Sequence, residues 1–102
     1  MASNNATVNL AIQFLPLRYP KDKAYEIVDA AIAVVQNSGL KYVVGPFETT
    51  VEGTYEAVFS LLEDMQEAAR NAGADELLIN MKLHRSFIED MHITDKTGKY
   101  NA

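Results

Sequence analysis

The sequence predicts an α+β domain in which two helices cover one face of a four-stranded antiparallel sheet. Two segments alternate apolar with polar residues, as half-buried strands do, and two others repeat apolar residues at helical spacing. Between the two helical segments lies a run rich in β-branched residues, interrupted at Gly45 and Pro46, which predicts a hairpin. The order of the segments is therefore strand, helix, hairpin, helix, strand.

The first strand is predicted from Thr7 to Leu15. Pro16 and Pro20 follow it and break the extended pattern, because each proline lacks a backbone donor and restricts the residue before it. The alternation assigns the residues of this strand to two sides. We expect Val8, Leu10, Ile12 and Phe14 in the core, and Asn9, Ala11 and Gln13 on the opposite side of the sheet.

Two amphipathic helices are predicted, the first from Lys21 to Ser38 and the second from Thr54 to Ala72. Gly39 and Gly73 follow them, and a glycine in this position ends a helix by adopting the left-handed conformation. Thr54 is the predicted N-cap of the second helix. The helix residues expected in the core are Ile27, Val28, Val35, Val58, Phe59, Leu62 and Met65.

The hairpin occupies Lys41 to Gly53, and the last strand is predicted from Glu76 to His84. Alternation in that last strand places Ile79 and Met81 in the core. The outward-facing residues of the strands form a second face of the sheet, which the helices leave open. Because this face mixes apolar with polar residues, we expect it to be buried in a homo-oligomer, a tetramer. This open face contains Asn9, Ala11, Gln13, Thr50, Glu52, Leu78, Asn80, Lys82 and His84.

With right-handed crossovers, these elements form the ferredoxin-like βαββαβ sandwich. We expect one such domain over residues 1–102, with its core at about residues 7–85 and a C-terminal extension at residues 86–102. In this extension, Thr94 to Tyr100 fits either a short helix, weakened by Gly98, or a hairpin that turns at Asp95 to Gly98.

Composition narrows the classes of function. The net charge of −5 disfavours nucleic acid and anionic membranes as partners, since both are bound through concentrated Lys and Arg. Cysteine is absent, no apolar run is long enough to span a membrane, and the first residues lack a signal-peptide pattern, so we expect a cytoplasmic protein. Between Glu48 and Glu76, eight carboxylates stand against Arg70 alone, which favours a cationic or neutral ligand over a phosphate.

The sequence contains no motif for catalysis or metal binding. Its two histidines, His84 and His92, lack the spacing of metal ligands and are expected to be ordinary surface or interface residues. An RNA-recognition sheet would need aromatic residues on its open face and basic surroundings, but the chain is acidic and its first and last strands place no aromatic residue there. An acyl-phosphate hydrolase would need an anion-binding loop after the first strand, where this chain has a stiff segment without glycine. We therefore expect a protein that is no enzyme and needs no cofactor.

The hairpin holds the residues that most suggest a function. Thr49, Thr50 and Glu52 are polar residues in what should be a central strand, and Phe47 lies beside them in the sequence. The alternative is that the threonines are ordinary strand formers and that the neighbouring glycines only make turns. Composition does not decide between a binding site and a purely structural hairpin.

The segment Gly-Pro-Phe-Glu-Thr-Thr-Val-Glu-Gly at residues 45–53 resembles the thiamine-binding protein family of small ferredoxin-like proteins. The similarity extends from about Val8 to Leu83 and includes the strand end Asn-Met-Lys-Leu at residues 80–83. The resemblance implies a non-enzymatic protein that binds thiamine or its hydroxymethylpyrimidine part and assembles as a homotetramer through sheet faces. The alternative is a structural or regulatory homo-oligomeric interaction module without such a ligand.

Strand adjacency locates the expected site. In a ferredoxin-like sheet the first strand lies antiparallel to the third, so the end of one lies beside the start of the other. Hydroxyls, amides and a carboxylate can bind the edge of an aminopyrimidine ring while an aromatic side chain packs on its face. The expected ligand-binding residues are Gln13, Phe47, Thr49, Thr50, Glu52 and Asn80, with Tyr19 or Tyr25 closing the site.

Overall fold

The computed structural model describes residues 6–100. Both ends of the expected domain therefore lie outside the described residues, and so do the first five residues of the segment that was judged to lack a signal-peptide pattern. The six predicted elements occur in their predicted order. They are followed by a short helix, α3, at Ile93–Thr97 and a 3-10 turn at Gly98–Tyr100, which confirms the helical alternative for this segment. The six elements are β1 (Thr7–Leu15), α1 (Lys21–Gln36), β2 (Lys41–Val44), β3 (Thr49–Thr54), α2 (Tyr55–Asn71) and β4 (Leu78–His84).

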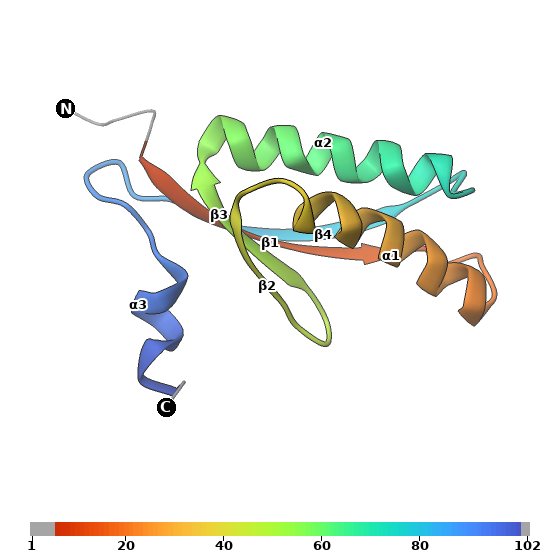
Figure 1. Ribbon diagram of the computed structural model, residues 1–102, viewed down its shortest axis with the longest axis horizontal. Helices are drawn as coiled ribbons and strands as arrows, with labels where there is room; N and C mark the ends of the chain where they lie inside the picture. Colours follow the sequence, from red (N-terminus) through yellow and green to blue (C-terminus); the bar gives the residue numbers. More distant parts are fainter. Residues whose placement is uncertain (1–5, 101–102) are drawn as a thin grey trace.

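The sheet is antiparallel with strand order β2-β3-β1-β4, and α1 and α2 lie together over one of its faces (Figure 1). This arrangement confirms the ferredoxin-like sandwich. In the middle of the sheet, Ile12 of β1 pairs with Thr49 of β3 on one side and with Met81 of β4 on the other. Residues paired across strands point to the same side of a sheet, so the register separates a helix face from an open face.

Both helices end as the sequence predicts. Gly39 and Gly73 have φ angles of 81° and 109°, and this left-handed conformation is strained for any residue with a Cβ atom. At the start of α2, the Ala57 N–H donates a hydrogen bond of 3.2 Å to the Thr54 hydroxyl, which confirms Thr54 as the N-cap. Local chemistry thus sets where both helices end and where α2 begins.

The core lies between the sheet and these two helices. Of the residues predicted there, Val28, Phe59 and Ile79 are only partly buried, and the prediction for Met81 is wrong, because 48% of this residue is exposed. Met81 lies on β4, which is an edge strand outside the best-covered part of the sheet. The large side chains with the least exposure are Leu10, Ile27, Val8, Val35, Val51 and Val58.

Candidate functional site

A hollow of about 470 Å³ lies on the open face, between the sheet and α3. We call it the open-face hollow. Its volume is within the range of roughly 300–1,000 Å³ that is usual for small-molecule sites. Its floor comes from β1 and β3, and its sides come from β2, β4 and α3. The polar lining consists of Asn9, Thr50, Lys82, His84, Lys96 and Thr97, and the apolar lining includes Ala11, Val43 and Ile93.

Helix α3 forms one wall of the hollow because side chains of the sheet hold it there. The Ile93 N–H donates a hydrogen bond of 2.5 Å to a Glu52 carboxylate oxygen, and the Ile93 residue is only 6% exposed. The ammonium of Lys96 donates to Asn9 Oδ1 at 2.7 Å, and Asn9 Nδ2 donates to the Met91 carbonyl at 3.1 Å. Strands β1 and β3 therefore fix a segment that is 41 to 87 residues distant from them in the sequence.

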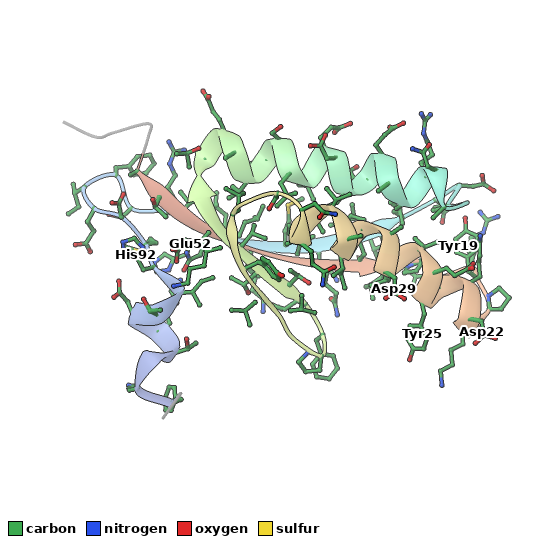
Figure 2. All side chains as sticks on the ribbon, in the orientation of Figure 1. Tyr19, Asp22, Tyr25, Asp29, Glu52 and His92 are labelled. Atoms are coloured by element: carbon green, nitrogen blue, oxygen red, sulfur yellow. The ribbon has the colours of Figure 1, made fainter. Side chains whose placement is uncertain are left out.

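Glu52 is the centre of this attachment. Its side chain is 11% exposed, and its second carboxylate oxygen lies 3.3 Å from Nδ1 of His92 (Figure 2). Burial by itself would raise the pKa of Glu52. The hydrogen bond from the Ile93 N–H, the hydrogen bond and charge of His92 and the charge of Lys41 outweigh the burial, and the pKa of Glu52 lies below its ordinary value.

The structure separates the two threonines of the expected site. Thr50 points to the open face and lines the hollow, whereas Thr49 points to the helices and is 5% exposed. Thr49 instead lines a cavity of about 90 Å³ together with Phe47, a residue that is 79% exposed. This cavity is well below the usual size of a small-molecule site.

The other expected residues lie on the open face or at the far end of the molecule. Asn80 donates a hydrogen bond of 3.2 Å to the side chain of Gln13, and this pair lies along the strands from the hollow without lining it. Tyr19 and Tyr25 lie at the opposite end of the molecule from Glu52 (Figure 2). The Tyr19 hydroxyl accepts a hydrogen bond from the Asp75 N–H at 2.6 Å, so it has a structural partner.

Comparison with known proteins identifies the family. The family profile described as thiamine-binding protein matches residues 10–101 of the chain. The chain belongs to the thiamine-binding protein family. Consistent with this, a UPF0045 protein of Clostridium perfringens is 31% identical over 94 residues, which cover 92% of this chain and 97% of that protein.

Solved structures of similar proteins agree with the fold of this family member. A Bacillus cereus protein described as a domain of unknown function, DUF77, is 35% identical and has a TM-score of 0.87, covering 95% of this chain and 92% of that one. A Thermotoga maritima protein that carries a provisional thiamine biosynthesis/salvage name is 25% identical, with a TM-score of 0.84 and coverage of 93% and 99%.

Several lining residues of the hollow in this family member were not among the expected site residues. Lys82 and His84 lie on the open-face side of β4. The alternation of that strand predicts this position, so the sequence could have added both residues to the expected site. Ile93, Lys96 and Thr97 come from α3. Nothing in the sequence of α3 indicates that it lies against the sheet, because that placement depends on distant residues.

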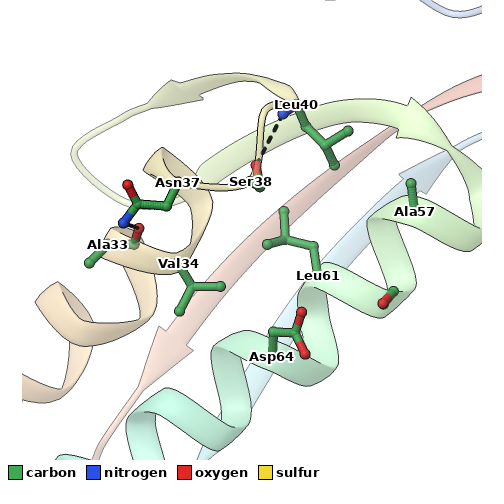
Figure 3. A pocket seen from close by; sticks show the side chains of 9 residues that line it. Ala33, Val34, Asn37, Ser38, Leu40, Ala57, Leu61 and Asp64 are labelled. Atoms are coloured by element: carbon green, nitrogen blue, oxygen red, sulfur yellow. Dashed lines mark hydrogen bonds between the residues drawn. The ribbon is translucent and has the colours of Figure 1, made fainter.

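A second hollow, of about 540 Å³, lies between the C-terminal part of α1 and helix α2 (Figure 3). Its polar side chains, which include Asn37, Ser60 and Asp64, belong to exposed residues, and it contains none of the expected ligand-binding residues. Local structure accounts for some of its polar groups, since Asn37 donates to the Ala33 carbonyl and the Ser38 hydroxyl accepts from the Leu40 N–H. The open-face hollow is therefore the better candidate site in this thiamine-binding family member.

Neither a membrane span nor a metal cluster is found between residues 6 and 100. Within this range no helix combines the length and apolar character needed to cross a membrane. The same residues contain no group of three or more His, Cys, Asp or Glu side chains placed to share a metal ion.

Proposed function

We propose that this protein binds thiamine or a related aminopyrimidine in the open-face hollow. We further propose that it does so in the cytoplasm, catalyses no reaction and needs no cofactor. The observation that carries the proposal is a hollow of about 470 Å³ with both apolar and hydrogen-bonding walls in a member of the thiamine-binding protein family. The thiamine biosynthesis/salvage name of the Thermotoga maritima relative supports the same class of ligand.

The lining suits the aminopyrimidine ring of such a ligand. Ala11 and Val43 offer an apolar surface against which a flat ring can pack. The hydroxyl of Thr50, a half-buried residue that pairs with Ala11 on one side and with Val43 on the other, can both donate to a ring nitrogen and accept from an exocyclic amine. Asn9 is less available, because its side-chain amide already bonds Lys96 and the Met91 carbonyl.

Replacing Thr50 with valine is expected to raise the Kd for thiamine or hydroxymethylpyrimidine roughly 5- to 30-fold, equivalent to about 1–2 kcal/mol. Valine keeps the shape of threonine but leaves a polar group of the ligand without its partner. Thr49→Val is the matched control, since it makes the same change in the neighbouring residue, whose side chain points to the helices. Isothermal titration calorimetry measures both.

Two outcomes would count against the proposal. Equal losses of affinity in Thr50→Val and Thr49→Val would show that the hollow is not the site. Failure of the unmodified protein to bind either ligand at millimolar concentration would exclude this ligand class and favour the structural or regulatory interaction module instead.

We also propose that the protein is a homo-oligomer, a tetramer, assembled through the part of the open face beyond the hollow. Helix α3 lies at the end of the sheet that contains Asn9 and Glu52. Leu78 pairs with Leu15 six residues further along β1, about 20 Å away at roughly 3.3 Å per residue. Leu78 is 48% exposed, and a second copy can cover it without filling the hollow.

Light scattering at micromolar concentration is expected to give a mass near four times the chain mass of 11.3 kDa. Leu78→Lys should lower that mass, because each interface would then bury a charge without a partner. Leu17→Lys is the control, since Leu17 is 69% exposed in the loop after β1. A monomeric mass for the unmodified protein, or dissociation by Leu17→Lys alone, would contradict the proposed assembly.

A further inference from the structure

The open-face hollow differs in charge from three other hollows of the molecule. Lys82, His84 and Lys96 line it, and no carboxylate of residues 6–100 does. By contrast, the hollow between α1 and α2 contains Asp64, and the small cavity beside Thr49 contains Glu48. A fourth hollow beside α2, lined in part by Arg70, contains Glu63, Glu67, Asp75 and Glu76.

The cations in the open-face hollow are weakly neutralised. Lys96 donates to Asn9 Oδ1, and because this partner is a neutral amide the charge of the ammonium is left in place. Lys82 lies 3.3 Å from a Glu48 oxygen, but its side chain is 81% exposed, and exposed ion pairs of this kind are weak. Glu52 lies beside the hollow and lowers its net positive charge, but its side chain is only 11% exposed and its oxygens face the Ile93 N–H and His92.

We propose that the hollow selects the phosphate monoester of its aminopyrimidine ligand over the free alcohol. This inference rests on the proposed function and adds the chemical form of the ligand. A phosphate monoester carries about −1.5 to −2 charges at pH 7 and offers three acceptor oxygens, which complement two ammonium groups and an imidazole. The apolar surface of Ala11 and Val43 is left for the ring.

The charge of the whole chain argues for the opposite preference, but the carboxylates responsible lie mostly away from the hollow. Most of the carboxylates between Glu48 and Glu76 belong to α2 or to the turn after it, on the helix side of the sheet. Glu56, Glu63 and Glu67 are exposed residues of that helix. Screening in water confines their effect to about 10 Å at moderate ionic strength, so the local lysines decide which ligand the hollow prefers.

Titration of the full chain with thiamine, thiamine monophosphate and inorganic phosphate at about 0.1 M salt tests this inference. We expect the monophosphate to bind about 10-fold or more tightly than thiamine, and the advantage to shrink as salt is added. Inorganic phosphate should bind more weakly than the monophosphate, since it lacks the ring. If thiamine binds as tightly as its monophosphate, the inference is wrong while the proposed function stands. If neither binds, both are wrong.

Two variants connect the preference to the lysines. In Lys96→Gln and in Lys82→Gln, the ratio of the two dissociation constants is expected to fall about 3- to 10-fold. This is less than for a buried charged group, because both lysines are exposed residues. Lys82→Gln is included because Lys96 also holds α3, whereas Lys82 does not. Lys99→Gln is the control, with the same change of charge on a residue outside the lining. An unchanged ratio in both lining variants, or inorganic phosphate binding as tightly as the monophosphate, would overturn the inference.

Discussion

Replacing Leu10 with alanine is expected to lower the free energy of unfolding by about 2.5–5 kcal/mol. Leu10 has no exposed surface and lies on β1, between Val51 of β3 and Leu83 of β4. The substitution removes buried apolar atoms and leaves a cavity that the surrounding strands and helices can fill only in part. Since domains of this size are stable by about 5–15 kcal/mol, the loss is a large fraction of the total.

Urea unfolding followed by circular dichroism measures this effect. Leu17→Ala is the matched control and should change stability by less than about 0.5 kcal/mol, because Leu17 is 69% exposed outside the strands. All samples need the same protein concentration, since association stabilises the folded chain. A loss below about 1 kcal/mol in Leu10→Ala would show that β1 is not packed as described.

The elements of the fold follow from local signals in the sequence. Alternation identified β1 and β4, and the glycines at positions 39 and 73 marked the ends of α1 and α2 through their positive φ angles. Met81 shows the limit of this reasoning. Alternation assigns Met81 correctly to the helix side of the sheet. Its exposure depends on how far the helices extend over the edge strand, and packing between distant elements decides that.

The site was less predictable than the fold, for two reasons. Thr49 and Thr50 are neighbours in the sequence and were expected to act together, yet successive residues of a strand point to opposite faces, and the pairing with β1 places only Thr50 on the open face. The second reason is α3. Its position depends on hydrogen bonds from this segment to Asn9 and Glu52. The pattern of apolar and polar residues within residues 86–100 does not predict contacts with these distant residues.

Glu52 connects the stability of this segment with the shape of the hollow. Its carboxylate accepts from the Ile93 N–H and lies beside His92, so it holds the wall that Ile93 and Lys96 contribute. A neutral amide in its place keeps the size of the side chain but loses the charge that both contacts use. The wall should then open more often, which exposes amides that are protected in the unmodified protein.

Glu52→Gln is expected to destabilise the attached segment by about 1.5–3 kcal/mol, the usual contribution of hydrogen bonds to a charged group. Hydrogen exchange measures the effect directly: the Ile93 amide should exchange faster in the variant, while the Leu10 amide is little affected. Glu63→Gln is the control, because Glu63 is an exposed residue of α2. Unchanged exchange at Ile93 would mean that Glu52 does not hold α3.

The same residue predicts how stability depends on pH. Because the pKa of Glu52 is lower in the folded protein than its ordinary value of 4.5, the folded state releases this proton more readily than the unfolded chain does. The contribution of Glu52 is therefore complete above about pH 4.5, and it is lost as the pH falls through the lowered pKa of the folded state. In Glu52→Gln this component is absent, so the difference in stability between the two proteins should be constant near pH 7 and shrink on acidification. A difference that stays constant down to pH 3 would show that the carboxylate is not stabilised by the Ile93 amide and His92, and that another contact fixes the wall of the hollow.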